Sequence, residues 1–210
     1  MPVAAIKAFC RNYLPQMAVI YHVEHGDTRY DAEDKAQGLL AMGLTEAGKR
    51  QAREAGRRLK GTKIDCIYTS PMVRAKETAD IICGILGGDT KVIVRPNLRP
   101  LDIGELAGKS NSTVRKYLDF YFTRPTLSFP NGEKVKDWYA IIRKEWIHQF
   151  ADDDPEIAVV SHARDWQLLN HWQKNGLDAG PQGVSFEEPK SAQVAKVTKS
   201  GNSISVRQIA

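Results

Sequence analysis

Two histidines and an arginine stand where a folded sheet would bring them together. His25 follows a β-rich run at residues 17–23, and His162 closes a later apolar run. Arg74 follows the run at 64–70 and falls in the first turns of an expected helix. Because the carboxyl ends of parallel strands face one ligand crevice, we expect these three side chains to converge there. Imidazoles and a guanidinium beside helix N-termini would form an anion site.

The elements that must position these residues alternate between strand-like and helix-like patterns. This alternation is typical of an α/β fold with a sheet and crossover helices. The run at 157–162 is continuously apolar, as expected for a central strand that is buried on both faces. Strands are predicted at 17–23, 64–70, 91–95 and 157–162, with a terminal hairpin over 192–210.

Capping residues predict where the helices begin. Thr45 is a good N-cap for a helix that stops at Gly61. Ser70 is expected to cap the next helix with Pro71 at its first position, where proline fits because that N–H is unpaired anyway. This helix would turn Met72, Ala75, Ala79 and Ile82 inward, and a further helix is expected to begin near Arg164.

The stretch from 109 to 150 predicts an insertion of two helices joined by the loop "TRPTLSFPNG". Apolar residues of the second helix recur on one face, which favours a core position over a ligand platform. They are Val135, Trp138, Tyr139, Ile142, Trp146 and Phe150.

Length and composition favour one globular domain. The 210 residues are 42% hydrophobic and 26% charged, and no apolar stretch approaches the roughly 20 residues of a membrane helix. The net charge of +5 is spread along the chain among acids, which indicates a solvated surface and no nucleic-acid partner. We expect a single domain over 17–210, preceded by an N-terminal extension over 1–16.

The cysteines and the first residues predict a cytoplasmic protein. Cys10, Cys66 and Cys83 are odd in number and widely spaced, so they are expected to be free thiols in a reducing compartment. The N-terminus lacks the long apolar core of a secretory signal. No metal cluster is expected, because His22, Glu24 and His25 lack the spacing of a helical zinc motif.

Several segments together resemble the histidine phosphatase superfamily, the phosphoglycerate mutase-like proteins. "VEHGDT" resembles the Arg-His-Gly-x-Thr motif of that family, and "VVSHARDWQLL" resembles the block with its second histidine. "LTEAGKRQAREAGRRL" and "IDCIYTSPMVRAKETADII" look like the two long blocks between them, and "DIGELAG" and "FPNGE" like two later loops. The resemblance implies a three-layer α/β/α sandwich with a mostly parallel central sheet and a helical insertion over the site.

The resemblance also implies that the phosphoryl group of a small phosphorylated substrate is transferred to a histidine and then to water, with no cofactor. By analogy, His25 is the nucleophile, while Arg74 and His162 hold the phosphate oxygens. Gly26 would let the backbone approach the phosphate, and Thr28 would offer a hydroxyl. The neighbours of His162, Ser161 and Ala163, would complete the substrate pocket.

Four positions depart from the family pattern. Glu24 stands in place of the motif arginine, Asp31 in place of an asparagine, and Ala163 in place of a glycine. Pro100 stands where many members place the glutamate that acts as general acid. Reversing a charge about 4 Å from phosphate changes the interaction by twice about 4 kcal/mol at an effective dielectric near 20.

Three alternatives follow for Glu24. It points away from the site, it is protonated, or phosphate is no longer the ligand. A protonated Glu24 would be a competent general acid in place of Pro100, with Asp102 and Glu105 as rival donors. If phosphate is not the ligand, the protein is a catalytically impaired member that uses the fold as a binding module.

The insertion raises one further alternative and one expectation. "STVRKYLDFYFTR" interleaves basic and aromatic residues that could bind an anionic polymer, but we favour an insertion helix that packs its aromatics over the mouth of the site and keeps its charges in water. The resemblance implies that residues 109–150 cover the site and set the preference for the leaving group. Arg143 and Arg164 could point into the pocket and restore the positive charge that Glu24 removes. The sequence leaves the substrate and the oligomeric state open.

Overall fold

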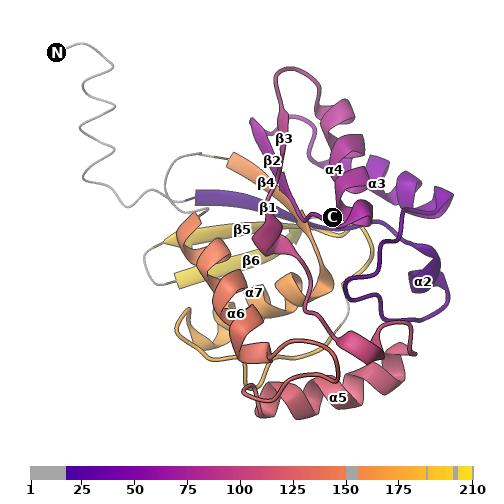
Figure 1. Ribbon diagram of the computed structural model, residues 1–210. Coiled ribbons are helices and arrows are strands. Elements are labelled where there is room, and N and C mark those ends of the chain that lie inside the picture. Colours follow the sequence, from indigo (N-terminus) through magenta and orange to yellow (C-terminus); the bar gives the residue numbers. More distant parts are fainter. Residues whose placement is uncertain (1–17, 150–155, 188, 201–202, 210) are drawn as a thin grey trace.

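A six-stranded sheet with the strand order β3-β2-β4-β1-β5-β6 forms the centre of the protein (Figure 1). The computed structural model describes residues 18–149, 156–187, 189–200 and 203–209. Strands β1 to β4 pair in parallel, whereas β5 is antiparallel to β1 and β6. The mostly parallel sheet and the terminal hairpin are therefore confirmed. The strands are β1 Ala18–Glu24, β2 Cys66–Thr69, β3 Lys91–Val94, β4 Glu156–Ser161, β5 Val194–Ser200 and β6 Ser203–Ile209.

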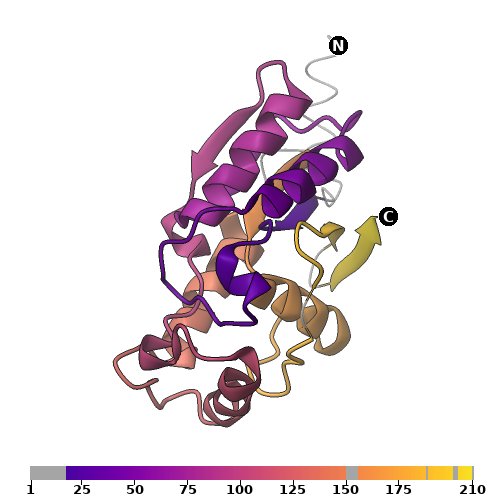
Figure 2. The same cartoon turned by 90° about the vertical axis from the view of Figure 1, so that its right-hand side faces the viewer.

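Helices cover both faces of this sheet, which confirms the three-layer α/β/α sandwich. Helices α3 and α4 lie side by side on one face, as Figure 2 shows, and α6 and α7 lie on the other (Figure 1). The α-helices are α2 Arg29–Ala32, α3 Glu46–Arg58, α4 Val73–Leu86, α5 Asn111–Thr123, α6 Val135–Lys144 and α7 Ala163–Asn175. Two 3-10 turns, η1 Pro96–Leu98 and η2 Gly104–Leu106, and one π turn, η3 Glu145–Gln149, connect them.

Alternate residues of the central strand β4 face two separate hydrophobic cores. Ile157 and Val159 belong to the core beneath the insertion and α7, and Ala158 and Val160 to the core beneath α3 and α4. Because both faces of β4 are buried in a core, its side chains from Ile157 to Val160 are all apolar, which explains the continuous apolar run in the sequence.

The start of α4 differs from the prediction. The helix begins at Val73 with Met72 as N-cap, not at Pro71 with Ser70 as the cap. The Ser70 hydroxyl lies 2.8 Å from Nε2 of His162, and it accepts a hydrogen bond from the Met72 N–H at 3.3 Å. Met72 is half-buried rather than inward, while the other three expected residues, Ala75, Ala79 and Ile82, are buried.

The loop after β1 is held tightly against α3. The predicted cap is present, because the Thr45 hydroxyl accepts the Gly48 N–H at 3.0 Å. A Cβ on Gly48 would lie 2.2 Å from the Asp27 carbonyl oxygen, and a Cβ on Gly26 would lie 2.4 Å from the Gly48 carbonyl oxygen. Both glycines are therefore needed for the close approach of two backbones.

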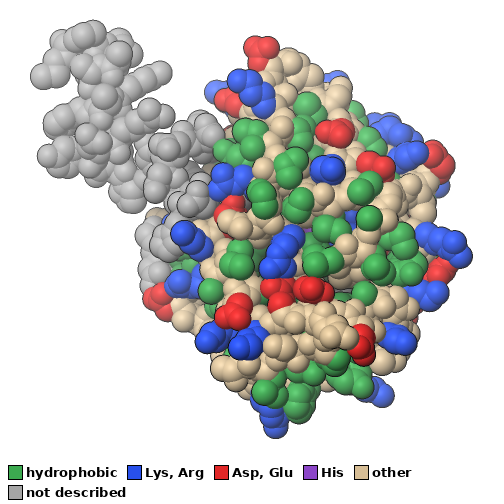
Figure 3. Space-filling model, viewed as in Figure 1, with side chains coloured by type: hydrophobic (Ala, Val, Ile, Leu, Met, Phe, Trp, Pro, Cys, Tyr) green, Lys and Arg blue, Asp and Glu red, His purple; other side chains and the backbone are tan. Residues whose placement is uncertain are grey.

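The insertion packs its aromatic residues as expected on α6 but not on α5. The α6 face is buried from Val135 to Trp146, while Phe150 lies outside the described residues. On α5, Phe122 is buried in the core, whereas Tyr117 and Phe120 are exposed, and none of the three lines the cavity described below, so the expected packing of these aromatics over the mouth of the site is not observed. Basic and acidic side chains are interspersed over the face in Figure 3 rather than gathered into one patch.

Three other expectations concern termini and membranes. The N-terminal extension, Cys10 and the hairpin turn at 201–202 lie outside the described residues. Cys66 and Cys83 are free thiols. Among the described residues, no helix has both the length and the apolar character that a membrane crossing requires.

Candidate active site

The two predicted histidines meet at one edge of the sheet. Strands β1 and β4 are neighbours, with Glu24 paired to Ser161, so His25 and His162 follow a matched pair of positions. The His25 N–H donates to the Ser161 carbonyl oxygen at 3.3 Å, and the ring centroids of the two histidines are 5.3 Å apart. Parallel register thus places both imidazoles at the carboxyl ends of adjacent strands.

The hydrogen bonds of His25 fix its tautomer. Nδ1 lies 2.9 Å from the Gly26 carbonyl oxygen, which can only accept, so Nδ1 carries the proton. Nε2 is then an acceptor and receives the Arg74 Nε–H at 3.2 Å. Burial, reinforced by the charge of Arg74, lowers the pKa of His25 to about 3. The imidazole is neutral at ordinary pH, with a lone pair on Nε2.

Arg74, from the first turn of α4, connects the two histidines. It is 2% exposed, and its guanidinium also donates to the carbonyl oxygens of Leu40 and Gly38, each at 3.0 Å. Its Nη2 lies 3.5 Å from Nδ1 of His162. Burial lowers its pKa to about 10, against the charges of nearby carboxylates, so Arg74 remains a cation.

His162 is the N-cap of α7 and is also neutral. Burial, then the charge of Arg74, lowers its pKa well below the usual value. Because Nδ1 faces the guanidinium of Arg74, the proton of the neutral ring lies on Nε2 and is donated to the Ser70 hydroxyl. This partnership explains why Ser70 does not cap α4.

Glu24 faces the nucleophile candidate rather than pointing away. The side chain is 5% exposed, and Oε1 lies 3.3 Å from Nε2 of His25. The first of the three alternatives raised by the sequence is therefore wrong. A carboxyl oxygen and an imidazole lone pair at this distance repel each other unless a proton lies between them.

Three other sequence candidates have structural partners of their own. The Thr28 hydroxyl caps α2 by accepting the N–H groups of Tyr30 and Asp31, and Asp31 in return accepts the Thr28 N–H at 2.7 Å. Burial raises the pKa of Asp31. The Ser161 hydroxyl lies 3.0 Å from Nε2 of His22, behind the site. These contacts form the supporting layer of the site.

A cavity of about 340 Å³ opens above His25. Its floor is formed by His25, Arg74 and His162, with Glu24 and Ala163 beside them. Pro100 also lines the cavity, but Asp102 and Glu105 do not: Asp102 accepts the Gly104 N–H, and Glu105 accepts from Asn131. Of the insertion, Asn111 and Val114 reach the cavity.

Comparison of the sequence with models of known protein families shows which family has this site. The model of the histidine phosphatase superfamily (branch 1) matches residues 20–205. The chain belongs to the histidine phosphatase superfamily. Among its relatives, the probable phosphoglycerate mutase GpmB of Cronobacter sakazakii is 41% identical over 126 residues. The uncharacterized phosphatase PhoE of Bacillus subtilis is 36% identical over 122 residues. Each match covers 58% of this chain and 58% of the relative's own length.

Solved structures share the fold at low sequence identity. A mycobacterial glucosyl-3-phosphoglycerate phosphatase superimposes with a TM-score of 0.74 at 21% identity, covering 92% of this chain and 98% of that one. A putative alpha-ribazole-5'-P phosphatase from Escherichia coli gives a TM-score of 0.73 at 17% identity, covering 91% and 95%. At these identities the likeness establishes the fold alone.

Sequence reasoning missed several polar residues that line this cavity, among them Asp27, Asp34 and Gln37. Asp27 lies within the motif "VEHGDT" and could have been found from its position two residues after His25. Gln37 carried no signal, because it lies in a loop without periodicity. Of the two arginines expected to restore charge, Arg164 lines the cavity, whereas Arg143 donates to the Leu177 carbonyl oxygen instead.

Metal ligands were not expected from the sequence. No group of three or more His, Cys, Asp or Glu side chains suited to a metal is present in the described part of the chain.

Proposed function

We propose that this protein is a phosphomonoester hydrolase that works through a phosphohistidine on His25. The observation that carries this proposal is the fixed tautomer of His25, whose Nδ1–H donates to Gly26 and leaves the Nε2 lone pair at the cavity floor. Nε2 would attack phosphorus, the ester oxygen would leave with a proton, and water would then hydrolyse the phosphohistidine to inorganic phosphate. Arg74 would neutralise the developing charge.

The leaving oxygen needs a proton, and we assign Glu24 as its donor. Its carboxyl group is 3.3 Å from Nε2, next to the position where phosphorus would bond. Pro100 has no proton to give, and the rival donors Asp102 and Glu105 do not line the cavity. In the second step the carboxylate would accept a proton from the attacking water and return to its starting form.

A second candidate function is a binding module without turnover. The observation that favours it is the saturation of the floor: Arg74 donates to two backbone carbonyls, and His162 donates to Ser70. A phosphate would have to compete with these partners and with the Glu24 carboxylate. In this case the fold would hold a ligand less anionic than a phosphomonoester.

Hydrolysis of 4-nitrophenyl phosphate between pH 4 and 8 separates the two functions. His25→Ala should abolish activity by at least about 10³-fold. His171→Ala is the matched control, because it removes a buried imidazole of α7 whose Nε2 contacts Gly180 and not the cavity. Activity should also fall toward pH 8 if Glu24 must be protonated, while neutral His25 persists down to pH 4. An inactive protein that gains activity on Glu24→Arg would instead support the binding module.

A further inference from the structure

One side of the cavity is lined by acceptors from a single short segment. Asp27, Asp31, Asp34 and Gln37, here called the acceptor wall, all line the cavity. They lie in the loop after β1, in α2 and in the turn that follows it. The segment is fixed in place, because Asp27 accepts from Ser191 and Gln51, and Asp31 accepts from Thr28.

The atoms of the acceptor wall that can still form hydrogen bonds are oxygens, which accept. Gln37 is 8% exposed and donates through Nε2 to Asp31 Oδ1 at 2.9 Å, so its Oε1 is directed elsewhere. That Oε1 is buried and has no hydrogen-bond partner among the described residues. Asp34 accepts from Asn111 Nδ2 at 3.0 Å through Oδ1, and its second oxygen adds a further acceptor. A buried acceptor without a donor is costly, so a ligand that supplies donors is favoured.

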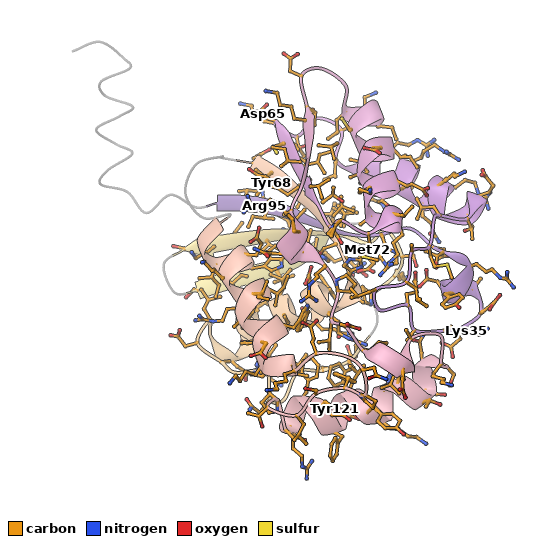
Figure 4. All side chains as sticks on the ribbon, viewed as in Figure 1. Lys35, Asp65, Tyr68, Met72, Arg95 and Tyr121 are labelled. Atoms are coloured by element: carbon orange, nitrogen blue, oxygen red, sulfur yellow. The ribbon has the colours of Figure 1, made fainter. Side chains whose placement is uncertain are left out.

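The charges around the cavity agree with a donor that is also a cation. With Glu24 protonated, as its role as proton donor requires, the three aspartates of the acceptor wall are the negative groups, and Lys35, Arg74 and Arg164 are the basic side chains of the lining. The Lys35 ammonium pairs with the Glu33 carboxylate at 2.7 Å, so its charge is already compensated, and Figure 4 shows Lys35 on the turn after α2, close to α5. Because both histidines are neutral, Arg74 is the cation of the floor.

A second part of the cavity lining, which comes from the loop after β3 and the first turn of α5, is apolar. None of its side chains carries a charge. They are Pro100, Leu101, Ile103 and Val114. A short carbon chain would pack against these side chains, while its polar end turned to the acceptor wall.

We propose that the cavity selects phosphate esters of amino alcohols, with the phosphate at Arg74 and the protonated amine on the acceptor wall. This inference rests on the proposed function, because it places the phosphate on the same floor. The ammonium group donates up to three hydrogen bonds to Gln37 Oε1 and the aspartates. The carbon chain between the two groups lies along the apolar wall.

Two isosteric esters test the proposal directly. Phosphoethanolamine and propyl phosphate have the same chain length and differ at the terminal group, which is an ammonium in one and a methyl in the other. The full-length protein should bind phosphoethanolamine at least about tenfold more tightly by calorimetry, equivalent to about 1.4 kcal/mol. The same preference should appear in kcat/KM for phosphate release.

Variants that remove a negative charge test whether the preference for phosphoethanolamine comes from the acceptor wall. Asp34→Asn keeps an oxygen for Asn111 and removes the charge, so the preference should fall at least about threefold, and Asp31→Asn/Asp34→Asn should abolish it. Asp80→Asn is the matched control: it removes the same charge from an exposed position on α4 outside the cavity, and the preference should not change. Thermal unfolding verifies that each variant is folded.

The outcomes separate this inference from the proposed function. Equal affinities and equal hydrolysis of the two esters, with activity lost in His25→Ala, would overturn the amine site and leave the phosphatase intact. Tighter binding of phosphoethanolamine without hydrolysis of either ester would support the amine site and overturn the hydrolase. Failure of both esters to bind would overturn both. A preference that survives in the Asp31→Asn/Asp34→Asn double variant would also overturn the amine site.

Discussion

At the scale of single residues, Glu24 distinguishes this site from a simple anion pocket. Its carboxyl oxygen is 3.3 Å from Nε2 of His25, at a place where phosphate chemistry favours a cation. The general-acid hypothesis makes the carboxyl useful because it supplies the proton that the leaving oxygen requires. This hypothesis can be tested with substrates whose leaving oxygens differ in their need for a proton.

Glu24→Gln should slow the hydrolysis of an alkyl phosphate far more than that of 4-nitrophenyl phosphate. Nitrophenolate leaves without protonation, whereas an alkoxide does not, so we expect a loss of about 10²-fold or more for glycerol phosphate and a small loss for the aryl ester. Initial rates of phosphate release measure both. Asp102→Asn and Glu105→Gln should leave the ratio unchanged, because neither residue lines the cavity. Equal losses on the two esters would refute a role for Glu24 in proton donation.

Buried ionisable residues also predict how stability depends on pH. Burial lowers the pKa of His22 and of His25 to about 3, and that of His162 well below 6.5. Between about pH 3 and 6.5, the unfolded chain binds protons that the folded protein excludes, so acid lowers the free energy of unfolding. Asp165 acts in the opposite direction, because burial raises its pKa to about 7 and the folded state holds its proton up to that pH.

Three histidines outweigh one aspartate, so stability should decrease from pH 6.5 to pH 4.5. Each uncompensated proton corresponds to about 1.4 kcal/mol per pH unit. Urea unfolding at several pH values measures the slope. His22→Asn should make the slope shallower, and Asp165→Asn should make it steeper. A flat profile between pH 4.5 and 6.5 would show that these imidazoles are accessible to protons.

Residue types and spacing predicted which histidines and which arginine would converge, because strand ends alone determine that placement. Residue types and spacing could not predict the roles of side chains whose hydrogen-bond partners lie far away in the sequence or are chosen by the fold. Thr28 has the right type for a phosphate contact, but its hydroxyl caps α2. Ser70 has the right type for a helix cap, but it pairs with His162. Small polar residues suit several such roles, and the neighbours brought by the fold select one.

At the scale of elements, the contact between α3 and the loop after β1 fixes the segment that follows His25. A Cβ on Gly48 would lie 2.2 Å from the Asp27 carbonyl oxygen, closer than any side chain can approach without moving backbone. The sequence predicted α3 and its cap from periodicity and Thr45. It could not predict that Gly48 is a packing residue, because a glycine inside a helix gives no indication of its neighbour.

Gly48→Ala should therefore destabilise the protein and lower its activity. Overpacking of this kind costs about 1–3 kcal/mol, and the displaced loop carries Asp27 of the cavity. Gly84→Ala is the matched control: Gly84 also lies inside a helix, α4, but a Cβ at this position would meet no atom within 4 Å. That change should stabilise by about 0.5–1 kcal/mol. Urea unfolding of both variants gives the comparison, and similar effects of the two would contradict the packing role.

At the scale of the whole molecule, the sheet order could be anticipated only in part. Apolar runs gave the strands, and crossover helices implied parallel pairing, but β4 lies between β2 and β1 although it comes much later in the chain. This non-local pairing brings His162 beside His25. The family resemblance supplied what local patterns lack, because it matches a complete arrangement rather than one segment.

An ion pair between Arg95 and the buried Glu145 joins the insertion to the sheet. Glu145 at the end of α6 is 2% exposed, and it accepts from Arg95 Nε at 2.6 Å and from Asn97 Nδ2 at 3.1 Å. Arg95 follows β3, and its guanidinium carbon lies 5.4 Å from the ring centroid of Tyr68 on β2. Both residues are labelled in Figure 4. The pair thus connects the start of η3 to the segments that follow the edge of the sheet.

Arg95→Met should destabilise the whole protein, because it leaves the Glu145 charge buried without its cation. Such a loss costs about 3–5 kcal/mol, whereas Arg95→Met/Glu145→Gln should recover part of it, since the second change removes the stranded charge. Arg57→Met is the control: its pair with Glu54 is exposed on α3, and its loss should cost no more than about 1 kcal/mol. Urea unfolding of the four proteins measures these differences. If Arg95→Met behaved like Arg57→Met, the ion pair would not hold the insertion, and the aromatic core beneath α6 would have to hold it alone.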